Sequence, residues 1–169
     1  MGKAVTSVLF VCLGNICRSP TAHGVFVALL ERHGLSDVIT VDSCGTGDWH
    51  IDSPPDPRAT AAAASRGYAL DDLRARQVQR QDFALYDYIL AMDGANLSDL
   101  KALCPEDYPG HLGLFLAFAK DIDIEDVPDP YYGGSDGFSQ VLDLIEAASE
   151  GLLHAINTEQ IRDDEAALR

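Results

Sequence analysis

Short apolar runs alternate along the chain with segments in which apolar residues recur every three or four positions. The runs predict β-strands at residues 7–11, 38–42, 86–91 and 112–118. The periodic segments predict helices near residues 19–33, 57–66, 95–103 and 136–156. Short apolar strands separated by helices are typical of βαβ crossovers. The predicted fold is therefore α/β: an open, four-stranded parallel sheet flanked by helices on both faces, with ligand sites at the carboxyl ends of the strands.

Length and composition indicate one domain. The chain has 169 residues, of which 47% are hydrophobic, enough to fill a single core, and it contains neither a linker nor an internal repeat. We expect residues 1–157 to form this domain and residues 158–169 to form a charged tail. The chain begins without a signal-peptide pattern and has no apolar segment of membrane-spanning length, and its four cysteines suit a reducing compartment. A soluble, cytoplasmic protein is expected.

The net charge of −15 changes the picture of possible partners. Binding by counterion release needs clustered Lys and Arg, so we expect neither nucleic acid nor an anionic membrane as a partner. The same charge repels anionic substrates at long range. An anion would have to bind in a locally positive pocket, and the plainer role of the charge is solubility.

The turn between the first strand and the first helix carries the candidate chemistry. Cys12 ends the strand and Arg18 follows six residues later. A Cys-x5-Arg spacing lets the N–H groups of residues 13–18 converge on a tetrahedral oxyanion, while the guanidinium grips two of its oxygens. An Arg, a helix N-terminus and converging N–H dipoles all favour an ionised thiol. Cys12 is therefore a candidate thiolate nucleophile beneath a bound phosphate.

The residues within this turn suit that geometry. Gly14 permits a backbone twist, and Asn15 tolerates the positive φ that a nest of N–H groups needs. Ser19 can cap the following helix or donate its hydroxyl to the sulfur. The turn lacks the Gly-Lys-Ser/Thr ending of a nucleotide-binding loop, and the Cys12 and Cys17 pair has poor spacing for zinc. The remaining alternative is that Cys12 is a buried cysteine with only a structural role.

The string V-C-L-G-N-I-C-R-S-P-T-A resembles the signature loop of the low-molecular-weight protein tyrosine phosphatases. Similar stretches follow in order up to about residue 157: Asp-Ser-Cys-Gly-Thr-Gly (42–47), Trp-His (49–50), Asp-Pro-Arg-Ala (56–59), Arg-Ala-Arg-Gln (74–77), Asp-Phe (82–83), Asp-Tyr-Ile-Leu-Ala-Met-Asp (87–93), Asn-Leu (96–97) and Val-Pro-Asp-Pro-Tyr-Tyr (127–132). The resemblance implies hydrolysis of phosphotyrosine on proteins, and of small aryl phosphates, through a phosphocysteine intermediate, without a metal or other cofactor.

The resemblance also assigns roles to residues. It implies Cys12 as nucleophile, Arg18 as phosphate ligand and Asp129, in the Pro-Asp-Pro-Tyr-Tyr loop, as general acid. It also implies that the phosphate is bound, and the loop supported, by Leu13, Gly14, Asn15, Ile16, Cys17 and Ser19. The wall that stacks on the aryl ring of the substrate falls to Trp49, Tyr131 and Tyr132, with Leu13. His50, beside Trp49, is either a residue that borders the pocket or an exposed loop residue, and the second is the preferred expectation.

Two positions, Leu73 and Ile16, differ from the residues that some relatives carry. Many relatives have a His that bonds the loop Asn where this chain has Leu73, so the support of Asn15 must come from elsewhere. Relatives that act on phosphoarginine carry Thr where this chain has Ile16, which favours phosphotyrosine. The alternatives are a protein arginine phosphatase, an arsenate reductase of the same fold, for which Cys44 and Cys104 are poorly spaced, and a non-catalytic phosphate-binding module. In relatives, a cysteine placed like Cys17 can form a disulfide with the nucleophile.

Overall fold

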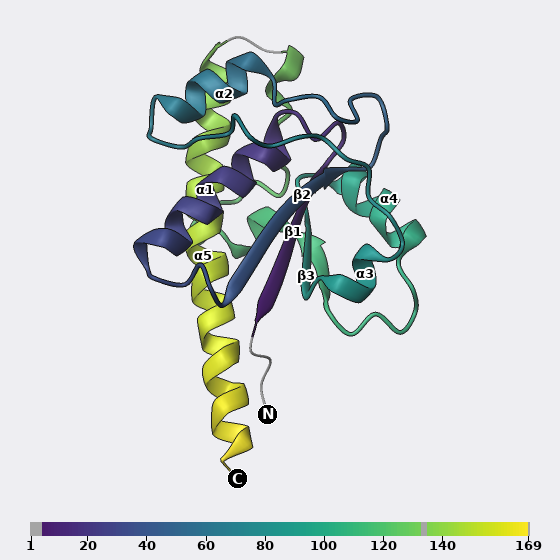
Figure 1. Cartoon of the computed structure of the whole chain (residues 1–169), viewed down its shortest axis with the longest axis vertical. Helices are drawn as coiled ribbons and strands as arrows, with labels where there is room; N and C mark the ends of the chain where they lie inside the picture. The colour runs from purple at the N-terminus through teal and green to yellow at the C-terminus, as the bar shows by residue number, and fades with distance from the viewer. Residues whose placement is uncertain (1–4, 133–134, 169) are drawn as a thin grey trace.

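A parallel sheet lies at the centre of the computed structural model, which describes residues 5–132 and 135–168. Its strands are β1 (Thr6–Cys12), β2 (Ile39–Gly45), β3 (Tyr88–Ala91) and β4 (His111–Leu114). They lie in the order β2-β1-β3-β4 (Figure 1). The predicted open, four-stranded parallel sheet is confirmed. The register pairs Cys12 with Gly45, so β1 and β2 end side by side at one edge of the sheet.

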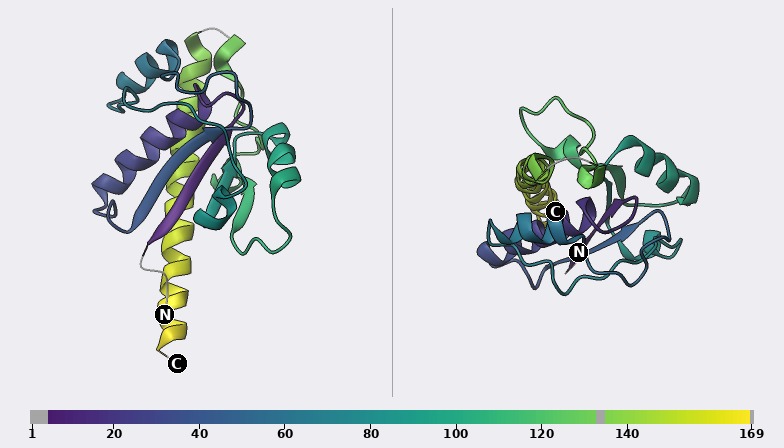
Figure 2. Two further views of the ribbon diagram at one scale, coloured as in Figure 1. Left: turned by 45° about the vertical axis from the view of Figure 1, so that its right-hand side comes forward. Right: turned by 90° about the horizontal axis from the view of Figure 1, so that it is seen from above.

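Helices cover both faces of the sheet (Figures 1 and 2). One face carries α1 (Arg18–Arg32) and the long α5 (Ser135–Ala167), with α2 (Pro57–Ala64) packed on both. The other face carries α3 (Asp82–Leu85) and α4 (Gly94–Leu103). The alternation along β1 explains the two layers, because Val8 and Phe10 enter the core beneath α1 and α5, whereas Leu9 and Val11 enter the opposite core.

Three elements differ from the sequence prediction. The fourth strand ends at Leu114, and a 3-10 turn, η1 (Phe115–Phe118), takes the place of its second half. The turn allows the consecutive Phe115 and Leu116 both to be buried, which strand alternation would prevent. The short helix α3 was not predicted. Helix α5 continues eleven residues past the predicted end at Ile156, through most of the segment expected to be a tail.

No helix among residues 5–132 and 135–168 is long and apolar enough to cross a membrane. No group of three or more His, Cys, Asp or Glu in the same residues is placed to hold a metal ion.

Candidate active site

The loop from Cys12 to Arg18 lies where β1 and β2 end and α1 begins. Its carbonyl groups are turned outward, since those of four loop residues accept hydrogen bonds from outside the loop or from the first turn of α1: Cys12 from Thr46, Leu13 from Gly47, Ile16 from Asp56 and Cys17 from Thr21. A side chain at Gly45 would place its Cβ 2.6 Å from the Leu13 oxygen, so the end of β2 can approach the loop only as glycine. The outward carbonyls leave the N–H groups of the loop to face its interior.

Asn15 holds the loop from within. It has the predicted left-handed backbone, with φ of 56°, and only 3% of its surface is exposed. Its backbone N–H donates to Cys12 Sγ at 3.2 Å, and its side-chain Nδ2 donates to Ser19 Oγ at 2.8 Å. The carbonyl oxygen Oδ1 accepts the backbone N–H of Arg76 at 3.0 Å. The support that Leu73 does not supply therefore comes from a main-chain donor three residues further on.

Ser19 contacts the sulfur directly. Its Oγ lies 3.0 Å from Cys12 Sγ and 3.3 Å from the Cys44 carbonyl. Because Asn15 already donates to this oxygen, the one hydroxyl proton has two acceptors within reach, of which the sulfur is nearer than the Cys44 carbonyl. Ser19 lies inside α1, whose N-cap is Cys17, and so of its two predicted roles it takes the contact with sulfur.

Arg18 is buried beside the sulfur with 3% of its surface exposed. Its Nη1 donates to Asp93 Oδ2 at 2.6 Å and to the Val127 carbonyl at 3.0 Å, and its Nη2 lies 3.6 Å from Asp129 Oδ2. Burial alone would lower the pKa of Arg18, but the negative charges around it outweigh burial and raise its pKa. The guanidinium is therefore charged and has one end fixed by protein acceptors.

Asp129 lines the cavity beside Arg18 and has a half-exposed side chain. Its Oδ1 accepts the N–H of Tyr131 at 3.0 Å, at the start of the 3-10 turn η2 (Pro130–Tyr132). Arg58 ties this turn to α2, because its Nη2 donates to the Tyr131 carbonyl at 3.0 Å while the guanidinium pairs with Asp56. The guanidinium also lies 5.4 Å from the centre of the Tyr131 ring. Asp129 is thus carried by a turn that Arg58 anchors to α2.

These groups surround a cavity of about 410 Å³. It is lined by Cys12, Leu13, Gly14, Ile16, Cys17, Arg18, Trp49, His50, Asp129 and Tyr131. Trp49 is 69% exposed and Tyr131 40% exposed, which leaves aromatic surface open at the cavity. The structure thus brings the predicted lining residues together, apart from Tyr132, whose side chain lies outside the described part of the structure.

One residue at the cavity differs from its expected environment, and it explains the need for Gly14. A Cβ at Gly14 would lie 3.0 Å from the ring of His50, closer than a Cβ usually approaches a neighbour, so this position favours glycine. His50 itself is half-buried against the cavity, not an exposed loop residue. The ring fills the space that the missing Gly14 side chain leaves, a tertiary contact that the sequence alone does not indicate.

The four cysteines are free and differ in environment. Burial, with a smaller effect from Asp56, raises the pKa of Cys17 to about 12, so this thiol stays protonated at neutral pH. Cys44 is fully buried in β2, and burial raises its pKa as well. Cys12 and Cys17 line the cavity; Cys44 and Cys104 are not among its lining residues.

The comparisons with known proteins agree with this geometry. Residues 7–162 match the family model described as low molecular weight phosphotyrosine protein phosphatase. The chain belongs to this family. It is 43% identical over 154 residues to the low molecular weight protein-tyrosine-phosphatase YfkJ of Bacillus subtilis, covering 91% of this chain and 97% of that protein. This phosphatase, a hydrolase, thus matches its relatives over most of their length.

Solved structures of relatives share the fold. The crystal structure of a protein tyrosine phosphatase from Entamoeba histolytica, with Hepes in its active site, matches with a TM-score of 0.88 at 40% identity, covering 92% of this chain and 99% of that one. A structure described as a Drosophila arginine phosphatase matches with a TM-score of 0.82 at 31% identity, covering 88% of this chain and 96% of that one. The fold is therefore common to proteins named for different phosphorylated residues.

Sequence reasoning assigned no role to several residues that position the site. Asp93 fixes Arg18, Arg58 anchors the turn that carries Asp129, and Arg76 holds Asn15. All three lie in stretches that resemble the family, which was the one available signal. Their contacts span 73 residues for Arg58, 75 for Asp93 and 61 for Arg76, so no local pattern reveals them.

Proposed function

We propose that this phosphatase hydrolyses phosphotyrosine on proteins, and small aryl phosphates, through a covalent bond between phosphorus and Cys12. The observation that carries the proposal is the contact set of the sulfur: Ser19 Oγ at 3.0 Å and the Asn15 N–H at 3.2 Å, beside the buried cation of Arg18. Donors and a positive charge favour a thiolate. The phosphorylated residue would enter the cavity with its phosphate on the loop.

In the first step the Cys12 thiolate attacks phosphorus in line with the leaving oxygen. Arg18, through the end of its guanidinium not fixed by Asp93, and the loop N–H groups hold the three equatorial oxygens as charge redistributes. Asp129, in its protonated form, donates a proton to the departing phenolate oxygen. The products of this step are the free phenol and phosphocysteine.

In the second step water releases phosphate. Asp129, now a carboxylate, removes a proton from the attacking water, and the bond between phosphorus and sulfur breaks. The Ser19 hydroxyl, 3.0 Å from the sulfur, stabilises the thiolate as it leaves. The half-exposed position of Asp129 supports this double role, because both the leaving group and water can reach it.

The cavity lining supports an aryl leaving group. Trp49 and Tyr131 present open aromatic surface, and Leu13 and Ile16 add apolar surface to the wall. Such a wall can cover a phenyl ring by stacking and apolar contact. Ile16 offers no hydrogen-bonding group to a guanidinium, which disfavours phosphoarginine. The buried Cys44 disfavours an arsenate reductase, whose redox cysteines must be able to meet. A phosphoprotein substrate in the cytoplasm is part of this proposal, since the free thiols suit a reducing compartment.

Turnover of a series of aryl phosphates by three proteins tests this mechanism. Cys12→Ser should lose all measurable turnover, and Asp129→Asn should fall by about a hundredfold or more in kcat/KM on phenyl phosphate. Because p-nitrophenolate leaves without much help from a proton, Asp129→Asn should lose less on p-nitrophenyl phosphate than on phenyl phosphate. Rapid quench of the wild type with labelled substrate should trap phosphate on Cys12.

Other substrates complete the test. Phosphoarginine and arsenate should be turned over far more slowly than an aryl phosphate by the wild type. Normal turnover in Cys12→Ser would overturn the mechanism. Preference for phosphoarginine would overturn the substrate assignment alone, and binding of phosphate without turnover of any of these compounds would leave only a phosphate-binding module.

A further inference from the structure

The segment around residue 76 joins the active-site loop to an ion-pair network in which Asp82 is buried, whereas Arg76 and Asp42 are half-exposed. The segment lies outside the helices and strands, apart from an isolated β-bridge between Gly45 and Gln77. Its main chain is fixed at both polar groups of Arg76: the N–H donates to Asn15 Oδ1 at 3.0 Å, and the carbonyl accepts the Gly45 N–H at 2.8 Å. We infer that Arg76 is a positioning residue for the Cys12 thiolate, acting through Asn15 and Ser19. The inference rests on the proposed role of Cys12.

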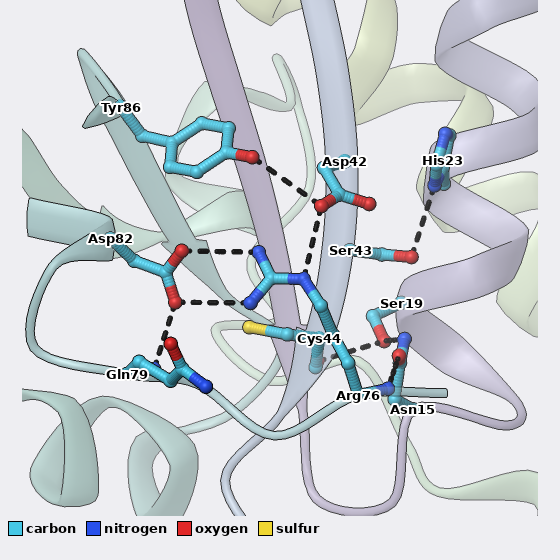
Figure 3. A network of polar contacts seen from close by, with 10 residues as sticks. All are labelled: Asn15, Ser19, His23, Asp42, Ser43, Cys44, Arg76, Gln79, Asp82 and Tyr86. Atoms are coloured by element: carbon cyan, nitrogen blue, oxygen red, sulfur yellow. Dashed lines mark hydrogen bonds and ion pairs between the residues drawn. The ribbon is translucent and has the colours of Figure 1, made fainter. Parts of the chain in front are cut away.

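The Arg76 side chain adds to the main-chain hydrogen bonds that Ala75 and Val78 make on either side of it, and it fixes the direction of the segment at Arg76. Its two terminal nitrogens form a fork with both oxygens of Asp82, each at 3.1 Å, and its Nε donates to Asp42 at 3.0 Å (Figure 3). Asp82 is 4% exposed and also accepts the N–H of Gln79 at 2.8 Å. The side chain thus reaches both β2 and the start of α3. A bidentate pair of this kind fixes direction as well as distance.

Asn15 transmits this position to the sulfur. A side-chain amide can lie either way round, and the Arg76 N–H selects the orientation in which Oδ1 faces Arg76 and Nδ2 faces Ser19 (Figure 3). With Nδ2 donating to Ser19 Oγ, the hydroxyl proton of Ser19 is directed to an acceptor, and Cys12 Sγ at 3.0 Å is nearer than the Cys44 carbonyl at 3.3 Å. If the N–H of Arg76 moves, Asn15 Oδ1 loses the only hydrogen-bond donor that it has among the described contacts. The Ser19 hydroxyl is then no longer directed to the sulfur.

Two substitutions act on the network with opposite effects on charge. Arg76→Met removes a positive charge, and Asp82→Asn removes a negative one, but both weaken the side-chain contacts that position the Arg76 N–H. We expect kcat/KM for p-nitrophenyl phosphate to fall about tenfold in each, the usual cost of removing a group that orients a catalytic residue. We expect the midpoint of the pH dependence of Cys12 alkylation by iodoacetate to rise by about half a unit in each, since one hydrogen bond to the sulfur is weakened.

Because Arg76→Met and Asp82→Asn change the charge in opposite directions, together they distinguish loss of positioning from a direct electrostatic effect on Cys12. A field from the network acting straight on Cys12 would move the midpoint up in Arg76→Met and down in Asp82→Asn. The other titratable groups around Cys12 stay the same in both variants: Cys17, Arg18, His50, Asp129 and Tyr131 at the cavity, and Cys44 and Asp93 behind it. In an Asn15→Ala background, Arg76→Met should leave the midpoint unchanged, because the path to the sulfur is already broken.

Arg66 provides a matched control. It is also an arginine paired with two carboxylates, Asp143 at 2.8 Å and Glu146 at 2.5 Å, but both lie on α5. Arg66→Met and Asp143→Asn should keep kcat/KM within twofold of wild type and should not move the midpoint. If Arg76→Met does not fold, Asp42→Asn weakens the Nε contact and leaves the fork with Asp82 intact; Asp42 is half-exposed and also accepts from the Tyr86 hydroxyl, and the variant should raise the midpoint by a smaller amount.

Each result decides the inference. A midpoint that rises in both Arg76→Met and Asp82→Asn, and no longer responds to Arg76→Met without Asn15, supports it. Unchanged midpoints, shifts of opposite sign, or an undiminished shift in the Asn15→Ala background would overturn it while leaving the proposed mechanism intact. Turnover by Cys12→Ser would instead overturn the mechanism itself.

Discussion

Arg18 combines a full charge with nearly complete burial, an arrangement that needs a partner at a fixed place. Asp93 is that partner, 2.6 Å from Nη1, and it also caps α4 by accepting the Asn96 N–H at 2.8 Å. One carboxylate therefore sets both the start of a helix and the direction of the guanidinium. The charge that binds phosphate is oriented before the substrate arrives, which reduces the cost of ordering it during the reaction.

Asp93→Asn should uncouple these two roles. Asparagine is a good N-cap, so α4 should persist, but the negative charge facing Arg18 is lost. We expect kcat/KM for an aryl phosphate to fall by about ten- to a hundredfold, and the free energy of unfolding to fall by about 1–3 kcal/mol because a charged hydrogen bond is weakened. Steady-state kinetics and urea unfolding measure the two effects.

A second acidic residue at the same helix end provides the control. Asp126 is exposed and accepts the Gly94 N–H at 3.0 Å, yet none of its described contacts is with Arg18. Asp126→Asn should keep kcat/KM within twofold of wild type. Wild-type kcat/KM in Asp93→Asn would show that Arg18 is oriented without this charge.

At the level of single residues, the loop could be predicted and its supports could not. Within eight positions, phosphate chemistry demands a thiol, an arginine, a residue with positive φ and a small hydroxyl, so Cys12, Asn15, Arg18 and Ser19 are recognisable from sequence. The partners of these residues arrive from distant segments. Arg76 contributes a backbone N–H, which any residue type but proline has, so no side-chain pattern could have revealed it.

Among the elements, α5 shows how far periodicity is informative. Its apolar stripe predicts the helix as far as Ile156, where burial ends. The helix nevertheless continues to Ala167 with mostly exposed residues, and hydrophobic periodicity gives no signal for such a stretch. One contact holds part of this extension: Tyr88, buried at the start of β3, donates its hydroxyl to Glu159. Burial, with Glu159 in second place, raises the pKa of Tyr88.

A chain that ends at residue 157 tests whether the extension is dispensable for catalysis. Tyr88 begins β3, whereas the active-site loop follows the opposite ends of the strands, so kcat/KM should stay within twofold of the full chain. The free energy of unfolding should fall by about 1–3 kcal/mol because Tyr88 loses a charged acceptor. Urea unfolding and aryl phosphate turnover measure the two quantities.

The Tyr88→Phe variant isolates the contact. In that background the same truncation should cost much less stability, because the hydrogen bond is already absent. An equal cost in both backgrounds would assign the stabilisation to other parts of the extension. A truncated chain that folds but has lost turnover would show that the domain extends beyond residue 157.

At the scale of the whole molecule, the net negative charge disfavours the approach of the proposed substrate. The chain carries a net charge of −15, and its proposed substrate carries a phosphate dianion. The positive potential that receives the phosphate comes from Arg18 and the loop dipoles, deep in the cavity, and it acts over a short range. Beyond roughly ten ångströms at 0.1 M salt, screening decides how strongly the acidic surface repels an approaching anion.

Salt should therefore accelerate capture of acidic substrates. Between about 20 and 200 mM NaCl, kcat/KM for a phosphotyrosine peptide flanked by Asp and Glu should rise about two- to fivefold, because the approach of the peptide is repelled less. A peptide flanked by Lys should show the opposite trend. The ratio of kcat/KM for the two peptides is the decisive quantity, since any competition of chloride for Arg18 cancels in it. A ratio that does not change with salt would mean that the acidic surface has no influence on substrate choice.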